Sequence, residues 1–102
     1  MLPINGLPPM HPGEFLREEF LLPLNLSANA LARDLHVPPN RITAILKEQR
    51  GITADTALRL GRYFGTTAQL WLNLQTSYDL KRAQDALNGR LEQEVRVLER
   101  AA

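Results

Sequence analysis

Cysteine is absent from this sequence of 102 residues. The absence excludes disulfide bonds and thiolate-bound metal ions, and it fits a reducing compartment. Long apolar runs are missing as well, so no segment reaches the length that a membrane-spanning helix requires. The N-terminal residues do not combine a basic region with a following apolar stretch, so we predict no signal peptide. These absences favour a cytoplasmic protein with no membrane partner.

Residues that carry catalysis or bind metal ions are also scarce. Of the two histidines, His11 lies in a proline-rich segment and His36 at a turn, and neither has a Glu-x-x-His or His-x-x-x-His partner. No glycine-rich phosphate loop occurs. Ser27 and Ser77 fall at a helix cap and within a helix, which explains both without a nucleophilic role. We therefore expect a binding protein without a cofactor rather than an enzyme.

The composition is that of a folded domain, with 44% hydrophobic and 23% charged residues. A chain of this length forms one domain that buries roughly two-thirds of the surface of its unfolded state. The net charge is only +1, but residues 28–62 hold six cations against three anions, whereas residues 1–27 hold one against three and residues 63–102 balance. This modest positive excess gives residues 28–62 the sign of charge that binding to nucleic-acid phosphates requires.

Residues 28–47 predict two short helices joined by a tight turn. Their apolar residues recur with the three-and-four spacing of buried helix faces and are Leu31, Ala32, Leu35, Val37, Ile42, Ile45 and Leu46. This spacing is typical of a helix-turn-helix and resembles that of the bacterial and phage repressor-like DNA-binding domains. Glycine is usual after the first helix, where the backbone is left-handed, and His36 is among the tolerated replacements. The same spacing also fits two helices that merely pack in a bundle.

The outer face of the second of these helices favours DNA. The outward residues are Asn40, Ala44 and Lys47, and the residues on their flanks are Arg41, Thr43 and Glu48. Asparagine pairs well with adenine and arginine with guanine, while the methyl groups of threonine and alanine can contact that of thymine. Pro38 and Pro39 fit the start of a helix, where a missing N–H is harmless. The alternative interpretation is a solvated helix face with no ligand.

Cap and stop signals predict the remaining helices. A first helix over residues 12–22 buries Phe15, Leu16 and Phe20 and ends at Pro23. Ser27 is the predicted N-cap of the second helix, and Gly51 is predicted to be left-handed in the loop after the third helix. Thr53 and Gly65 are the predicted cap and stop of a helix over residues 54–64, in which Gly61 allows another helix to approach closely. A Thr66–Gln69 capping box then starts a fifth helix, which runs to about Ala86.

These elements predict an all-α fold, a five-helix repressor-like bundle with short loops. The expected organisation is an extended arm over residues 1–11, the helix-turn-helix domain over residues 12–87 and a tail over residues 88–102. Asn88 and Gly89 indicate a helix stop, after which Leu91, Val95 and Leu98 recur at helical spacing. The tail therefore forms either a short sixth helix or a flexible segment.

Three stretches are similar to the HigA family of antitoxins, and the similarity covers about residues 10–83. They are the His-Pro-Gly-Glu run of residues 11–14, the Arg-Gly-Ile-Thr-Ala-Asp-Thr-Ala-Leu-Arg-Leu run of residues 50–60, and the Trp-Leu-x-Leu-Gln-x-x-Tyr-Asp-Leu pattern of residues 71–80. The resemblance implies an antitoxin of a type II toxin–antitoxin pair. Such a protein forms a homodimer, represses its own operon by binding duplex operator DNA, and neutralises a HigB-like toxin that cleaves mRNA.

The resemblance also assigns roles to individual residues. It places Pro39, Asn40, Arg41, Thr43, Ala44 and Lys47 at the DNA groove, and Ser27, Gln49 and Arg50 at phosphates. His36 departs from the small residue that is usual in the turn. The apolar stripe of Leu70, Trp71, Leu74 and Tyr78 is interpreted as core and dimer-interface packing. Stacking on bases is disfavoured, because repressors of this shape bind duplex DNA.

Two other interpretations remain open from the sequence. One is a stand-alone transcriptional repressor that uses the same DNA surface without a toxin. The other is a protein-interaction module whose helix-turn-helix no longer binds DNA. The face formed by Glu14, Arg17 and Glu18 is either solvated or contacts a basic protein partner, and no residue is assigned to a toxin.

Overall fold

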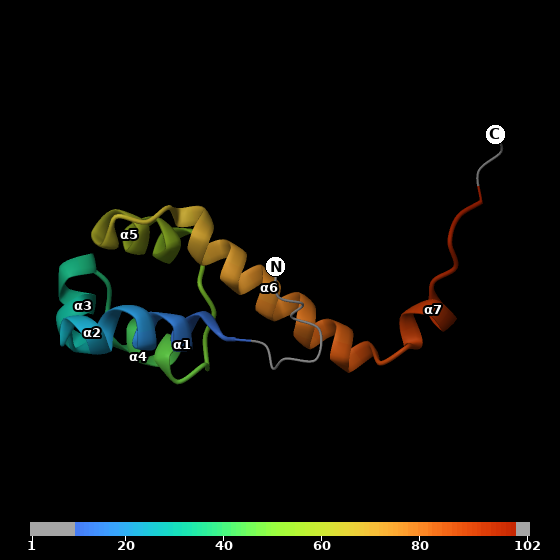
Figure 1. The fold of residues 1–102 in the computed structure, drawn as a ribbon, viewed down its shortest axis with the longest axis horizontal. Helices are drawn as coiled ribbons and strands as arrows, with labels where there is room; N and C mark the ends of the chain where they lie inside the picture. Colours follow the sequence, from blue (N-terminus) through green and yellow to red (C-terminus); the bar gives the residue numbers. More distant parts are fainter. Residues whose placement is uncertain (1–9, 100–102) are drawn as a thin grey trace.

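The computed structural model describes residues 10–99, and every regular element in this range is a helix. The helices before Phe64 gather at one end of the molecule, and the long helix that follows leads away from them toward the C-terminus (Figure 1). The all-α prediction is therefore confirmed. The predicted arm over residues 1–11 lies almost wholly outside the described residues, as do residues 100–102.

The first helical stretch is continuous but not uniform. It comprises α1 (Pro12–Leu16), a wider π-helical turn (Arg17–Leu21) and α2 (Leu22–Leu24), and it ends where Asn25 takes a left-handed conformation at φ 52°. The prediction that Pro23 ends this helix was wrong. The π turn explains why, because its wider spacing relieves the clash between a proline ring and the preceding turn of a regular α-helix.

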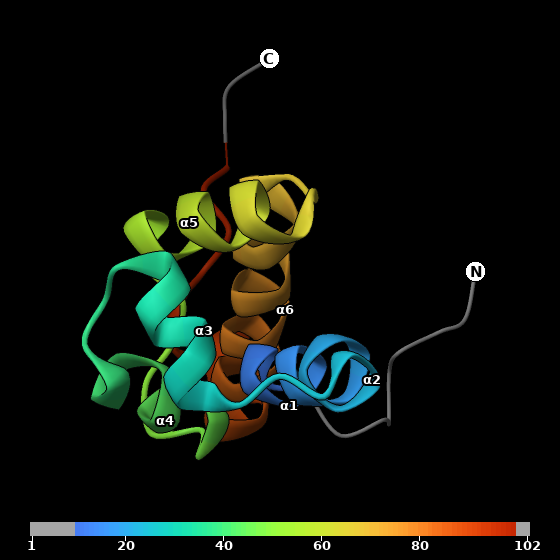
Figure 2. The ribbon, with the colours of Figure 1, turned by 90° about the vertical axis from the view of Figure 1, so that its left-hand side faces the viewer.

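The helix-turn-helix has the predicted boundaries. Helix α3 (Ala28–Leu35) begins where the Ser27 hydroxyl accepts a hydrogen bond from the amide of Ala30 at 3.0 Å. It ends at His36, whose φ of 59° is the left-handed turn that the sequence predicted. Helix α4 (Pro39–Leu46) follows at once. Helix α3 packs on α4, and the apolar faces of both helices are buried. The two helices lie next to each other in Figure 2.

Helix α5 (Ala54–Phe64) also follows its predicted signals, with Thr53 as N-cap and a left-handed Gly65 as stop. The prediction of a left-handed Gly51 was wrong, because Glu48 is the residue with positive φ in that loop. Gly51 has a different requirement. A Cβ atom there would lie 2.7 Å from the side-chain oxygen of Gln75, which accepts a hydrogen bond from the amide of Ile52 at 2.7 Å.

The long helix α6 (Ala68–Leu87) begins one residue later than predicted. Thr67 is its N-cap and accepts a hydrogen bond from the amide of Leu70 at 3.1 Å, so the predicted Thr66–Gln69 capping box was wrong. The Thr66 hydroxyl instead accepts from the indole N–H of Trp71 at 2.8 Å. Gly61 of α5 does allow a close approach, since a Cβ there would lie 2.9 Å from the amide nitrogen of Ala68.

Trp71 is the largest fully buried side chain of the core. Its ring packs against three half-buried phenylalanines, Phe15 from α1, Phe20 from the π turn and Phe64 from α5, with ring centroids 5.5, 5.6 and 6.4 Å away. The other buried apolar residues are Leu16, Leu21, Leu31, Ala32, Leu35, Val37, Ile42, Ile45, Ile52, Ala57 and Leu60. One core thus joins α1, the helix-turn-helix, α5 and the first turn of α6.

The predicted stripe on α6 is only partly core. Leu74 borders the core cluster, while Leu70 is half-buried outside it. Tyr78 is half-buried and meets the ring of His11 edge-on at 4.8 Å. The structure therefore confirms the packing role for Trp71 and leaves the proposed dimer contacts as predictions.

The C-terminal part extends away from the core. Within the described range, no residue after Trp71 is buried. A short helix α7 (Arg90–Glu94) is the possible sixth helix, but residues 95–99 are exposed and form no regular structure, so the helix is shorter than the spacing of Leu91, Val95 and Leu98 predicts. The molecule accordingly measures 56 × 28 × 28 Å. None of the helices among residues 10–99 is long and apolar enough to span a membrane.

Candidate nucleic-acid interface

Helix α4 has one buried and one exposed face, as the sequence predicted. Ile42 and Ile45 are fully buried against α3 and α1, whereas Asn40 and Lys47, the residue that follows the last one of the helix, are exposed. The remaining candidates on this helix are exposed Pro39 and half-buried Arg41, Thr43 and Ala44. A polar surface with one small residue at its centre can enter the major groove closely and still offer hydrogen-bonding groups.

The three candidate phosphate contacts lie at the edges of the helix-turn-helix. Ser27, Gln49 and Arg50 are all exposed. The Ser27 oxygen caps α3 as an acceptor, which leaves its O–H free to donate to a phosphate oxygen. Gln49 and Arg50 follow α4 directly and line an open polar hollow together with Gln75 and Arg82 of α6. Each of the three therefore has a donor that can reach an anion.

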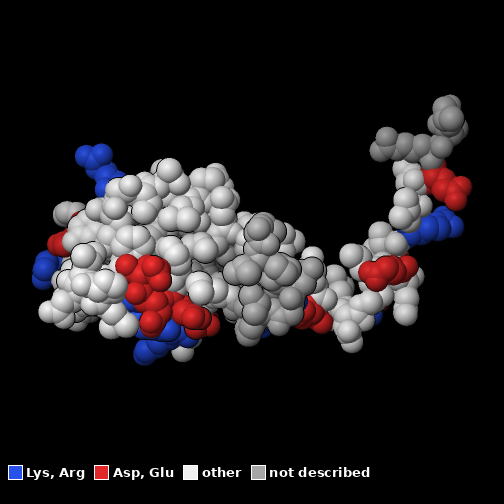
Figure 3. Space-filling view, viewed as in Figure 1, with Lys and Arg blue, Asp and Glu red and all other residues white. Residues whose placement is uncertain are grey.

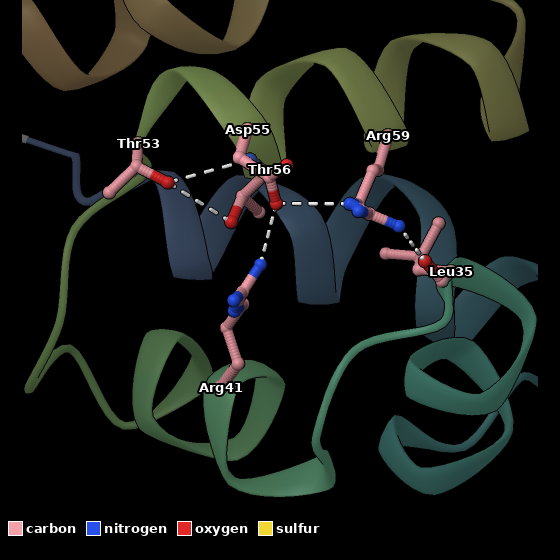
Figure 4. A network of polar contacts seen from close by, with 6 residues as sticks. All are labelled: Leu35, Arg41, Thr53, Asp55, Thr56 and Arg59. Carbon is pink, nitrogen blue, oxygen red and sulfur yellow. Dashed lines mark hydrogen bonds and ion pairs between the residues drawn. The ribbon is translucent and has the colours of Figure 1, made fainter.

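A charged network holds the first turn of α4 against α5 (Figure 4). A single carboxylate oxygen of Asp55 accepts hydrogen bonds from Nη1 of Arg41 at 2.7 Å and from Nε of Arg59 at 3.0 Å. Nη1 of Arg59 also donates to the backbone oxygen of Leu35 at 2.8 Å. The hydrogen bonds from Arg59 and Arg41 hold the pKa of Asp55 below its ordinary value. Asp55 thus links α4, α5 and the end of α3.

Sequence reasoning missed this network. It placed Asp55 only in the first turn of a helix and Arg41 only on the flank of the outward face, at the DNA groove. The pairing between them spans 14 residues, so no helical periodicity reports it. The i, i+4 spacing of Asp55 and Arg59 was the one available signal, and it points to a local ion pair rather than to a link with α4.

The C-terminal end of α4 is held by the start of the first helical stretch. A Cβ atom on Gly13 would overlap the backbone oxygen of Ile45, so only glycine allows this approach of α1 to α4. One turn later, Nη1 of Arg17 donates to the backbone oxygen of Leu46 at 3.3 Å. The hydrogen bond from Arg17 gives a partner to the Leu46 carbonyl at the end of α4, where donors within the helix run out.

His11 fixes the start of α1 in the same region. Its side chain is almost fully buried, and Nδ1 accepts a hydrogen bond from the amide of Gly13 at 2.9 Å. Burial lowers the pKa of His11, although the charges of Glu48 and Asp79 oppose this shift. The acceptor role of Nδ1 requires the unprotonated nitrogen, so the cap and the burial both favour the neutral ring.

Charged side chains cover little of the main body in the face shown in Figure 3, where acidic and basic groups gather at the lower edge and at the left-hand end. The exposed acids of the π turn, Glu18 and Glu19, belong to the acidic N-terminal part of the chain. Glu18 pairs with Arg17 at 3.2 Å, and both side chains are well exposed. Such a pair is typical of a solvated surface and contributes little stability.

Comparison with known proteins decides the family. The helix-turn-helix family matches residues 16–71. Virulence-associated protein I of Dichelobacter nodosus is 68% identical over 80 residues, which cover 78% of this chain and 74% of that protein. The Pseudomonas aeruginosa antitoxin HigA, solved with the higBA promoter, is 50% identical with a TM-score of 0.85, and the match covers 89% of this chain and 99% of that one. The chain belongs to the HigA family.

A second solved relative of this HigA-family chain is PA4674 of Pseudomonas aeruginosa, whose crystal structure contains its operator DNA. It is 49% identical with a TM-score of 0.87, over 93% of this chain and the whole of PA4674. The family is one of helix-turn-helix antitoxins and regulators, which are not enzymes. The resemblance seen in the sequence is therefore confirmed.

Proposed function

We propose that this HigA-family protein binds operator duplex DNA through α4 and represses its own operon, in the cytoplasm, as the antitoxin of a HigB-like mRNA-cleaving toxin. The observation that carries the DNA-binding part is the exposed face of α4, held at both ends by the rest of the domain. Two relatives of about half-identical sequence were solved with operator or promoter DNA. Their overall similarity supports the same mode of binding here.

The outward side chains of α4 supply the chemistry of base recognition. Asn40 can accept from and donate to an adenine edge, and Lys47 can donate to a guanine or to a phosphate. Thr43 and Ala44 can place methyl groups against that of thymine, and Pro39 starts the helix without a backbone donor to satisfy. Each good bidentate pair discriminates against the wrong base by roughly 1–3 kcal/mol.

Ser27, Gln49 and Arg50 bind phosphates in this proposal and fix the position of α4 on the duplex. Contacts of this kind carry no base information but make affinity depend on salt. A homodimer then presents two copies of α4 to two half-sites of a palindromic operator. Half-buried Leu70 and Tyr78 of α6 are the proposed apolar contacts between copies, beside Leu74 at the edge of the core and Trp71 beneath them.

The decisive experiment for DNA binding is a mobility-shift titration with a duplex from the region upstream of the protein's own gene. Asn40→Ala should weaken operator binding by about 5- to 150-fold, which corresponds to roughly 1–3 kcal/mol. The matched control is Asn73→Ala, because Asn73 is an exposed asparagine on α6 that accepts a hydrogen bond from the nearby Gln69 side chain at 2.9 Å. Equal affinities of the two variants would contradict the assignment of α4 to the groove.

Toxin neutralisation needs a separate test. Expression of the neighbouring gene alone should arrest growth, and co-expression of this protein should restore it. The two proteins should also purify together. A protein that binds the operator but neither rescues growth nor retains a partner is a stand-alone repressor. A protein that retains a partner but shows no sequence-specific DNA binding is an interaction module.

A further inference from the structure

We propose that Asp55 is a positioning residue for operator recognition, because its carboxylate holds the first turn of α4 through Arg41. This inference rests on the proposed DNA binding by α4. It concerns a residue that lies on α5, outside the recognition helix. It also changes the proposed role of Arg41, which links α4 to α5 through Asp55 instead of binding a base.

The geometry makes Asp55 the meeting point of three elements of the domain. One of its oxygens accepts from Arg41 on α4 at 2.7 Å and from Arg59 on α5 at 3.0 Å. Arg59 then reaches the oxygen of Leu35, the last residue of α3, at 2.8 Å. Figure 4 shows Arg41 pointing up from α4 to this carboxylate, while Arg59 points to the end of α3. Charge-assisted bonds of these lengths are the stronger class of hydrogen bond.

This position matters because Arg41 lies in the first turn of α4, next to Asn40. A tie at that turn limits rotation of the helix about its axis, which would carry Asn40 away from its base. The other end of the helix is tied through Ile45 and Leu46 to α1 and the π turn. Recognition of a base needs the side chain to be placed within about half an ångström, so a loose first turn of α4 weakens discrimination between bases.

Folding has little need of the Asp55 carboxylate. Its side chain is 55% exposed, and exposed ion pairs contribute little to stability. The start of α5 is secured independently, since Thr53 caps it and Thr56 beside Asp55 is almost fully buried. A variant without the charge should therefore keep the fold and its melting temperature, so that a change in DNA binding reports on position.

The competing role for Arg41 predicts the opposite sign. If Arg41 binds a base or phosphate directly, Asp55 competes with the DNA for its guanidinium. Removal of the carboxylate would then free Arg41, delete a negative charge near the duplex and raise operator affinity. If Asp55 positions α4, its removal lowers operator affinity and leaves binding to random DNA as strong as before. The two roles of Arg41 therefore predict changes of opposite sign in operator affinity when the Asp55 carboxylate is removed.

The experiment compares Asp55→Asn with the matched control Asp34→Asn in the full chain. Asp34 is an exposed carboxylate on α3 that accepts from the Tyr63 hydroxyl at 2.6 Å and makes no hydrogen bond to α4. Affinities are measured for the upstream duplex and for a random duplex of equal length. We expect Asp55→Asn to weaken operator binding by about two- to fivefold without weakening random binding. Asp34→Asn should leave the ratio between the two duplexes unchanged.

Two further variants test the path through Arg41. Asp55→Asn combined with Arg41→Ala should bind the operator no more weakly than Arg41→Ala alone, because both changes break the same link. Asp55→Glu should restore part of the lost discrimination, since a longer carboxylate can still accept from both arginines. A raised operator affinity in Asp55→Asn, or an unchanged ratio, would overturn the inference. An unmodified chain with no operator preference would overturn the proposed function as well.

Discussion

Helix α4 and the second half of α6 are both helical, yet they differ in how many contacts they make with the rest of the domain. Helix α4 is contacted near both ends, by Asp55 from α5 and by Gly13 and Arg17 from the first helical stretch. From Asp79 to the end of α6, almost every residue is exposed and none is buried. Tertiary contacts therefore fix the position of α4, while the distal part of α6 depends on its own local stability.

The distal segment, residues 79–99, has no buried residue and is stabilised by local pairs of side chains instead. Lys81 pairs with Asp85 at 3.4 Å, and Arg82 donates to the Tyr78 hydroxyl at 2.7 Å, both at i, i+4 spacing. Pairs of this kind stabilise a helix by about 0.2–0.5 kcal/mol each. The core around Trp71 is worth several times more. Changes near α4 should therefore have large effects, and changes in the distal segment small ones.

The largest effect is expected for Trp71→Ala. This change removes the largest fully buried side chain and leaves a cavity beside Phe15, Phe20 and Phe64, which should cost about 3–5 kcal/mol of unfolding free energy. Leu80→Ala is the comparison, because Leu80 is 57% exposed and should stay within about 0.5 kcal/mol of the unchanged chain. Urea titration measures both. Similar unfolding free energies for the two variants would show that the side chain of Trp71 contributes no more to stability than the exposed side chain of Leu80.

Gly13→Ala should have the next largest effect. The added methyl group would overlap the backbone oxygen of Ile45 and push α1 away from α4, at a cost of about 1–3 kcal/mol. Gly89→Ala is the control in the distal segment, since no atom lies within 4 Å of the added carbon and only the positive φ is strained. Gly13→Ala should also weaken operator binding, which Gly89→Ala should not. Wild-type DNA affinity in Gly13→Ala would show that α1 does not position α4.

His11 adds a pH dependence to the same end of α4. Burial lowers its pKa in the folded chain, so below the ordinary value of 6.5 the unfolded chain binds protons that the folded chain does not. Stability should therefore decrease as the pH falls below about 6.5, until the folded pKa is passed. His11→Asn keeps a capping side chain without this titration. Thermal melts between pH 7 and pH 5 should show a shallower decrease for His11→Asn, and parallel curves would contradict the account.

The smallest effect is expected when the chain is ended after Asn88. This truncation removes α7 and residues that are exposed wherever they are described, so unfolding free energy should change by less than about 0.5 kcal/mol. Denaturant titration of the truncated and full chains gives the difference. A large loss of stability would show that the tail packs on the domain or on a second copy, and the contrast with α4 would then fail.

The sequence predicted the helices that carry local signals. Ser27, Thr53 and Gly65 act as predicted because a cap or stop needs only neighbouring backbone groups. The turn at His36 was recognised for the same reason. The prediction failed where the conformation or the identity of a residue depends on other parts of the fold. Pro23 is accommodated by the π turn before it, and Gly51 is required by the side chain of Gln75 from another helix.

The candidate site divides in the same way. The exposed positions of Asn40 and Lys47 follow from helical periodicity, so the outward face of α4 could be predicted. The tie between Arg41 and Asp55 could not, because it depends on how α5 crosses the helix-turn-helix. Periodicity tells which side of a helix is apolar but not which neighbour reaches its polar side. DNA contacts themselves stay predictions for the same reason.

We expect α4, and not the distal part of α6, to lie against the operator. The chain has no cysteine, so a single one placed at Gln49 or at Ala83 carries a DNA-cleaving reagent to a unique position. Both residues are exposed, one just after α4 and the other in the distal segment. The account predicts cleavage within the operator from Gln49→Cys and none from Ala83→Cys. Cleavage from Ala83→Cys alone would contradict it.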